Sequence, residues 1–241
     1  MRALSATELL DAWETGRDQP PVRQALTLLA AACPETPPAR LAELSIGQRD
    51  AQLIMLRTWT FGSAVAGLAT CPRCGDRLDF GLDLDEIRAP QPDTDGVIVV
   101  QASGWQVRCR LPTSADLLAI SERDGQDARQ VLLERCVLVA ERPAEAATSD
   151  LPPDVVAEVV RAMGEADPQA DVDLALTCPA CGHDFPAAFD VATHFWTEIA
   201  AWAARTLREV HALAGAYGWS EAEILALSPR RRQAYLDLIE P

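Results

Sequence analysis

The stretch TCPRCGDRLDFGLDL, residues 70–84, has a near repeat in TCPACGHDFPAAFDV, residues 177–191. Both contain Cys-Pro-x-Cys-Gly, and the apolar positions that follow also coincide, since Leu78 corresponds to Phe185. A Cys-x-x-Cys-Gly turn points two sulfurs at one ion, and its glycine tolerates the backbone conformation that the turn requires. We therefore interpret each stretch as a zinc knuckle followed by a strand.

The two knuckles together supply the ligands of one metal ion. Tetrahedral zinc takes four ligands and one knuckle provides two, so a pair of knuckles completes one site. Four thiolates leave no open coordination position, and the site is therefore expected to be structural. His183 lies two residues after Cys181 and could replace a ligand, hydrogen-bond to a sulfur or face solvent. The prediction is one Zn2+ per chain, held in a split zinc ribbon by Cys71, Cys74, Cys178 and Cys181.

The same cysteines permit a rival interpretation. A Cys-Pro-x-Cys pair can be a redox dithiol, as in thioredoxin-like proteins, where it lies at the start of a helix after a strand. Here glycine and strand-like residues follow each pair, which favours zinc. A thiol-disulfide oxidoreductase and a structural disulfide remain alternatives. The other thiols, which lie in apolar surroundings and are expected in the core, are Cys33, Cys109 and Cys136.

Composition narrows the class of protein. The 241 residues are 49% hydrophobic and 24% charged, with no run long enough to span a membrane and no secretory signal, so a cytoplasmic protein is expected. All 21 basic residues are arginine, which excludes lysine-dependent phosphate loops and Schiff bases. Common nucleotide-binding, hydrolase and metalloprotease motifs are absent. We expect neither an enzyme nor a binder of a small-molecule substrate.

The acidic residues are unevenly distributed. The net charge is -15, and residues 84–176 carry 18 Asp and Glu against 8 Arg, whereas residues 191–241 carry 6 against 5. An acidic segment argues against nucleic acid binding, which needs positive charge at the phosphates. It permits a basic protein partner, and it is equally explained by solubility.

Helical periodicity and end signals predict a mostly helical chain. A β-hairpin is predicted where VIVVQ and WQVRCRL flank residues 102–104, and DVDLALT is a further strand. Residues 90–96 are a turn-rich linker, and residues 141–153 are a loop. Helices are expected at about 6–14, 21–33, 47–60, 126–139, 153–163 and 191–215, with short ones after Thr113, Ser220 and Ser228.

The predicted fold class is α+β, mostly helical, with a split four-cysteine zinc ribbon and a small β-hairpin. The predicted regions are a helical segment at 1–70, ribbon halves at 71–84 and 171–190, an acidic insert at 85–170 and a helical segment at 191–241. Trp13, Trp59, Trp196 and Trp202 are expected in the core, and Trp105 near the hairpin turn is expected to be exposed. Residues 230–232 form a basic cluster that is interpreted as a solvated helix face.

Three stretches resemble a known family when taken together. They are the paired CPxCG knuckles, RLPTSADL at 110–117 and YGWSEAEILALSPRRRQAYLDLI at 217–239. The combination resembles baseplate and hub assembly proteins, including hub assembly chaperones, of T4-like phages and related contractile injection systems. The tail is also similar to small phage tail assembly proteins.

This resemblance implies a non-enzymatic assembly factor or minor structural subunit. Its partners would be baseplate or hub subunits, and incorporation into a phage-like particle stays open. A zinc-ribbon adaptor of another bacterial complex is the alternative.

Overall fold

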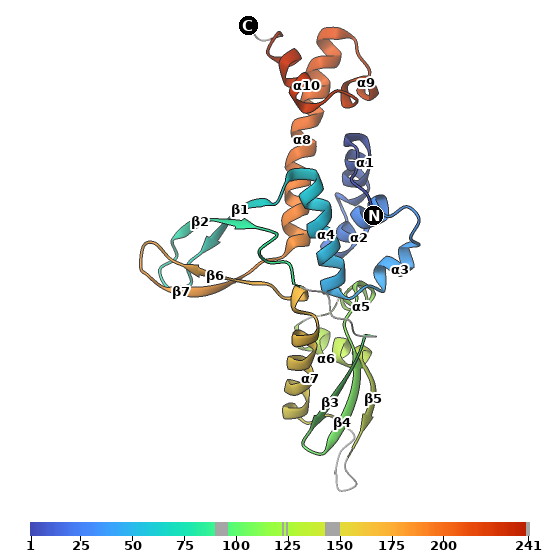
Figure 1. Cartoon of the computed structure of the whole chain (residues 1–241), viewed down its shortest axis with the longest axis vertical. Helices are drawn as coiled ribbons and strands as arrows, with labels where there is room; N and C mark the ends of the chain where they lie inside the picture. The colour runs from blue at the N-terminus through green and yellow to red at the C-terminus, as the bar shows by residue number, and fades with distance from the viewer. Residues whose placement is uncertain (90–95, 122, 124, 143–149, 240–241) are drawn as a thin grey trace. The chain divides into compact units, whose positions relative to one another are not determined.

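The computed structural model describes residues 1–89, 96–121, 123, 125–142 and 150–239. The chain forms two compact units (Figure 1), one made of residues 1–36 and 192–241 and the other of residues 37–191. The predicted linker at 90–96, except its last residue, and most of the predicted loop at 141–153 lie outside the described residues. None of the helices that the structure describes has the length and apolar content needed to cross a bilayer.

The unit that contains both ends of the chain is helical. Its helices begin at the predicted caps: the hydroxyl of Ser5 accepts from the N–H of Glu8, and Ser220 accepts from Glu223 in the same way. The core of this unit joins the first helix to the last three. The helices are α1 (Ala6–Gly16), α2 (Pro21–Ala32), α8 (Val191–Tyr217), α9 (Glu221–Leu225) and α10 (Pro229–Leu236). The core residues are Leu10, Ala203, Val210, Leu213, Ile224 and Leu225.

Residues 37–191 combine helices with three small antiparallel sheets, so the protein is α+β as predicted. The sheets are β1–β2, β3–β4–β5 and β6–β7. The strands are β1 (Ala64–Thr70), β2 (Arg77–Asp83), β3 (Val97–Ala102), β4 (Trp105–Arg110), β5 (Val137–Glu141), β6 (Asp173–Thr177) and β7 (Asp184–Ala188). The helices are α3 (Pro38–Ala42), α4 (Ile46–Phe61), α5 (Ser114–Ile120), α6 (Gly125–Cys136), α7 (Pro153–Ala166) and the 3-10 turn η1 (Pro168–Ala170).

Two strands correct the sequence prediction. The helix predicted at 126–139 ends at Cys136, and the residues after it form β5, which pairs with β4 through a bulge at Arg108 and Cys109. Val-Leu-Val-Ala has no clear period, so pairing with β4 decides its conformation. β1 was not predicted because Ala-Val-Ala-Gly-Leu-Ala has weak strand propensity, and its pairing with β2 supplies the missing preference.

Two tryptophans also differ from expectation. Trp105 is only 5% exposed, because it lies on the face of β4 that packs against Val155 and Val159 of α7. Trp59 is 46% exposed, because it follows the buried Arg57 by two residues and therefore points about 200° around α4 from it.

The N-terminus of α4 is anchored by a carboxylate from a distant segment. The N–H of Gly47 donates to Oδ2 of Asp167 at 2.9 Å, in a buried position. This N–H has no partner inside the helix, and negative charge is favoured at this end of the helix dipole. The approach requires glycine, since a Cβ at position 47 would lie 1.9 Å from Oδ1 of Asp167.

The segment RLPTSADL at 110–117 forms a buried polar junction. The side chain of Asp116 is 1% exposed and accepts from Arg110 at 2.6 and 2.9 Å and from Arg135 at 2.8 Å. Thr113 caps α5 and also donates to this carboxylate. The carbonyl of Pro112 accepts from the N–H of Ile46. The junction therefore ties β4, α5 and α6 to the start of α4.

Replacing Gly47 with Ala is expected to destabilise the protein by about 1–3 kcal/mol, because the new Cβ displaces Asp167 from the helix terminus. Urea unfolding followed by circular dichroism measures the change. Gly164→Ala is the control, since this exposed helical glycine has open space at Cβ and should gain about 0.4–1 kcal/mol. Equal effects of the two substitutions would contradict the anchoring role of Asp167.

Replacing Asp116 with Asn is expected to lower stability in a pH-dependent way. Burial raises the pKa of Asp116, but hydrogen bonds from Arg110 and Thr113 lower this pKa by more, to well below the usual range. The ionised carboxylate therefore contributes stability that is present above the unfolded pKa of about 3.9 and lost as pH falls toward the folded pKa. Asp116→Asn should cost about 1–3 kcal/mol at neutral pH, and this difference from wild type should shrink below about pH 4.

Unfolding curves at several pH values test this expectation. Asp127→Asn is the matched control, because its exposed pair with Arg123 should contribute less than about 0.5 kcal/mol. A deficit of Asp116→Asn that stays constant from pH 7 to pH 3 would assign the effect to something other than the charge.

Candidate metal centre

Both knuckles adopt the same hydrogen-bonded turn. The N–H of Cys71 donates to the carbonyl of Asp76, and the N–H of Cys178 donates to that of His183, each at 2.9 Å. The N–H of the glycine then donates back to the first cysteine, again at 2.9 Å in both turns. These glycines, Gly75 and Gly182, have φ values of 77° and 66°, which residues with a Cβ rarely adopt.

Strands of matching register flank the two turns. Thr70 faces Arg77 across the first hairpin, and Thr177 faces Asp184 across the second. The alignment of Leu78 with Phe185 is confirmed, since both occupy the second pair from the turn and both are buried. The internal repeat is therefore strand, knuckle, strand, one strand longer than the sequence repeat indicated.

The β1–β2 and β6–β7 hairpins lie side by side (Figure 1), and their four thiols come together. All four Sγ atoms lie within 4.8 Å of one another. Cys71 and Cys181 are 3.7 Å apart, and Cys74 and Cys178 are 3.6 Å apart. A tetrahedral zinc site with bonds of about 2.3 Å has sulfur–sulfur edges of about 3.8 Å. The cysteines are free thiols, and their separations fit a four-thiolate metal centre.

The electrostatics of the cluster favour a cation. Burial raises the pKa of the Cys71 thiol, but the N–H groups of Cys74 and Arg73 outweigh this effect and lower the pKa to about 7. The N–H of Asp76 lowers the pKa of Cys74, yet burial and the neighbouring thiols raise that pKa to about 12. One thiolate therefore forms readily while the next is opposed by its neighbours. A divalent cation would remove this opposition and allow all four thiols to ionise.

Little else joins the two hairpins. β1–β2 and β6–β7 are separate sheets, with no ladder between them among the described residues. A small apolar cluster accompanies the buried cysteines and consists of Leu78 and Phe185 with Ala69, Leu176 and Ala187 packed around them. Isolated two-stranded hairpins are marginally stable in water, so a shared metal would be the strongest link available to them.

His183 lies beside the cluster and outside the four-sulfur group. Its ring stacks on Phe185, with centroids 6.1 Å apart and planes inclined by 16°. This position shields one side of the second knuckle. Its neighbour Cys181 is exposed, as is Cys74, whereas Cys71 and Cys178 are buried.

The remaining chemical groups do not form a second centre. Cys33, Cys109 and Cys136 are buried, as predicted, and burial raises the pKa of Cys136 to about 11. In the described part of the chain, the four cysteines are the one group of three or more metal-ligating side chains close enough to share an ion. His194 lies 3.6 Å from Glu198, one turn away on α8, and His211 is exposed.

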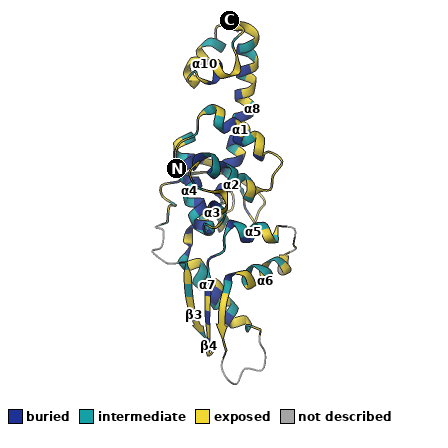
Figure 2. Cartoon of the chain, turned by 90° about the vertical axis from the view of Figure 1, so that its right-hand side faces the viewer, coloured by how far each residue is buried: buried dark blue, intermediate teal, exposed yellow. Residues whose placement is uncertain are grey.

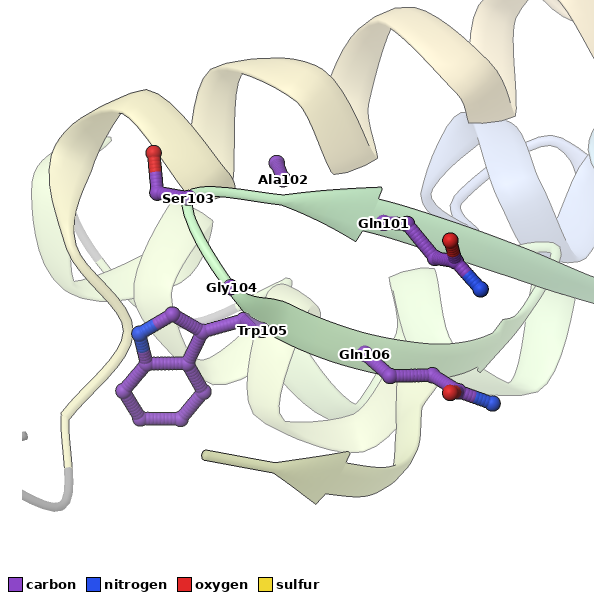
Figure 3. A pocket seen from close by; sticks show the side chains of 6 residues that line it. All are labelled: Gln101, Ala102, Ser103, Gly104, Trp105 and Gln106. Atoms are coloured by element: carbon purple, nitrogen blue, oxygen red, sulfur yellow. The ribbon is translucent and has the colours of Figure 1, made fainter. Parts of the chain in front are cut away.

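A hollow of about 370 Å³ lies at the β3–β4 turn (Figure 3). Gln101 and Gln106 are cross-strand partners whose amides line it, and the hydroxyl of Ser103 there donates to Asp154. Amides and a single hydroxyl supply neither a nucleophile with a base nor a metal ligand set, so this hollow offers no catalytic group.

The geometry bears on the redox alternative. In a thioredoxin-like dithiol the pair lies at a helix N-terminus, where the helix dipole activates one sulfur. Here each pair lies in a turn between two antiparallel strands, and each sulfur lies within 3.7 Å of a sulfur in the other knuckle. This arrangement is typical of a zinc ribbon.

A comparison with protein-family models matches residues 5–196 to the family described as T4 bacteriophage base plate protein. The match spans most of the chain, includes all four cysteines and ends within α8. No curated protein and no solved structure gives a significant match.

Purified protein is expected to contain about one zinc ion per chain, measured by plasma mass spectrometry. Cys178→Ser should lower this content to near zero, because three thiolates and a hydroxyl bind zinc far more weakly. Cys33→Ser is the matched control, since it removes a buried thiol outside the cluster. Zinc-free wild-type protein with thiols that oxidise and reduce reversibly would instead support the redox alternative.

Proposed function

The chain belongs to the T4 bacteriophage base plate protein family, and on this premise we propose that it is a non-enzymatic assembly factor or minor structural subunit of a phage-tail-like contractile baseplate. One structural zinc ion, held by Cys71, Cys74, Cys178 and Cys181, would stabilise it. The observation that carries the proposal is the family match over residues 5–196, which encloses the complete cysteine cluster.

A structural role for the metal follows from its ligands. Four thiolates fill the coordination sphere, donate strongly to the ion and leave no position for a substrate or water. The ion would therefore serve as a cross-link, and the surrounding residues would position the sulfurs and cover the site. The glycine turns orient the sulfurs, while Leu78 and Phe185 pack beneath them and limit access of water.

The proposed cross-link joins segments that are far apart in the sequence. The two halves of the ribbon are separated by residues 85–170, which fold into β3, β4, β5, α5, α6 and α7. Fixing both ends of this insertion restricts its movement relative to the helices that precede and follow it. Zinc binding energy would then act as folding energy for residues 37–191.

Protein partners are expected, because a baseplate is an assembly of protein subunits. The acidic character of residues 84–176 suits a basic partner and disfavours nucleic acid. Large apolar side chains also remain exposed on the described part of the insert, including Val99 at 54% and Leu138 at 48%.

Genetic complementation tests the proposal. In a host that carries the genes of the particle, removal of this chain should give tails or tubes without baseplates, visible by electron microscopy. Wild-type protein should restore complete particles, and Cys71→Ser/Cys178→Ser should not. Cys33→Ser/Cys136→Ser is the matched control and should restore assembly, provided that it accumulates to the wild-type level.

Mass spectrometry of purified particles then separates the two forms of the proposal. A retained subunit appears in the finished particle at a fixed ratio, whereas an assembly factor is absent from it. Normal baseplates in the complete absence of the chain would contradict both a retained subunit and an assembly factor. The alternative would then be a zinc-ribbon adaptor of another complex.

A further inference from the structure

The C-terminal residues form a folded element outside the family match. Residues 197–241 lie beyond the matched range and include most of α8 together with α9 and α10. We call the end of α8, α9 and α10, residues 205–239, the C-terminal cap. Glu209 of α8 pairs with Arg232 of α10 at 2.8 Å, and Ile224 and Leu225 of α9 are buried in the same core. The cap is therefore a defined structure.

An aromatic cluster forms part of the surface of the cap. Tyr217 and Trp219 stack with centroids 4.7 Å apart, and Tyr235 packs edge-on against Trp219 at 4.9 Å. The hydroxyl of Tyr217 donates to the carbonyl of Tyr235. Tyr217 is 37% exposed and Leu238 is 72% exposed. Rigid, partly exposed aromatic groups are enriched in protein interfaces, because they bury much apolar area at little entropic cost.

The cap also carries unpaired arginines. Arg205 and Arg208 are exposed neighbours on one face of α8, and Arg230 and Arg231 are exposed on α10. Figure 2 shows that much of α10 is exposed. None of the four forms an ion pair with a described residue. The third residue of the predicted basic cluster differs, since Arg232 is 3% exposed and has Glu209 as its partner.

The position of two of these arginines opposes helix stability. Arg230 and Arg231 occupy the first turn of α10, which contains no acidic residue. Cations at a helix N-terminus are unfavourable, because the helix dipole already places partial positive charge there. These two arginines therefore do not stabilise α10, whereas they could form ion pairs with an anionic partner.

The same chain carries the complementary surface. Residues 84–176 have 18 Asp and Glu against 8 Arg, whereas residues 191–241 are close to neutral with all five arginines in the cap. The cap also contains four acids, Glu209, Glu221, Glu223 and Asp237, so an acidic unit on a second copy would be attracted to the unpaired arginines rather than to a large net charge. Contact between different surfaces on two copies is heterologous, and repetition of such a contact produces rings or filaments.

We propose that the cationic, aromatic C-terminal cap of one copy binds the acidic unit, residues 37–191, of a second copy in a head-to-tail contact. The interaction uses the four free arginines for electrostatic attraction and the Tyr217–Trp219 stack as the apolar anchor. It goes beyond the proposed role of the zinc ion; because the acidic unit contains the four cysteines, the contact is tested on the metal-replete protein.

Sedimentation velocity of the full-length, metal-replete protein tests this contact. Wild type should associate with rising concentration at low ionic strength, and the association should weaken at least tenfold when salt is raised, because exposed charges are screened. Arg230→Glu/Arg231→Glu should abolish the association. These substitutions place acids in the first turn of α10, where the helix dipole favours them, so the variant should fold. Trp219→Ala should also weaken the contact through loss of the anchor.

Two controls separate this contact from a general charge effect. Arg17→Glu/Arg23→Glu changes the net charge equally at exposed positions that lie outside both the cap and the acidic unit, and it should associate like wild type. Fluorescently labelled Arg230→Glu/Arg231→Glu should still bind wild type, because its acidic unit is intact, although it cannot bind itself. The proposal would be overturned if wild type stayed monomeric at all concentrations, or if Arg230→Glu/Arg231→Glu associated as wild type does. A different acidic protein would then be the candidate partner of the cap.

Discussion

The arrangement of residues 37–191 depends on how four thiols are held within 4.8 Å of one another. The hairpins that carry them are separate sheets, and the apolar cluster beneath the sulfurs is small. Burial and the neighbouring thiols raise the pKa of Cys74 to about 12, so the thiols alone resist the fully ionised state that would bind most strongly. A closed metal centre would resolve both difficulties together, since an ion would neutralise the thiolates and supply a link between the hairpins.

Buried polar contacts stabilise the same unit in addition to the cysteine cluster. Asp167 follows α7 and precedes β6, the strand that leads into the second knuckle, and it anchors the N-terminus of α4 through Gly47. The helix that precedes the first knuckle is thus tied to the segment that precedes the second. The Asp116 junction then joins the inserted hairpin and helices to the same helix start. These carboxylate contacts therefore fix the insertion to the start of α4, and a metal ion held by the cysteines would add a second link.

The sequence predicted most helices and singled out the four cysteines that the structure brings together, because both depend on short-range patterns. Cys-x-x-Cys-Gly specifies its own turn, and the capping boxes at Ser5 and Ser220 mark helix starts within four residues. Strands β1 and β5 were not predicted because their residues have no strong local preference for a strand. Pairing with β2 and β4 determines their conformation. The exposure of Trp59 and burial of Trp105 depend on which face of an element meets its neighbour, which periodicity without a partner does not specify.

The arginines show why charge has to be interpreted together with burial. In the sequence the 21 basic residues are chemically identical, since none is lysine. The structure separates them by environment. Arg110 uses its planar fork on the buried carboxylate of Asp116, whereas Arg232 donates from Nε to Glu209 and from Nη1 to the carbonyl of Leu227, and both geometries suit guanidinium better than ammonium. Arg161, by contrast, pairs with two acids on the exposed face of α7, where such pairs contribute little. Adjacent residues can therefore differ completely in role, as Arg231 and Arg232 do. The function of the three arginines at 230–232 therefore cannot be inferred from their sequence alone. Only the arginines that are exposed and unpaired can use their charge to bind another molecule.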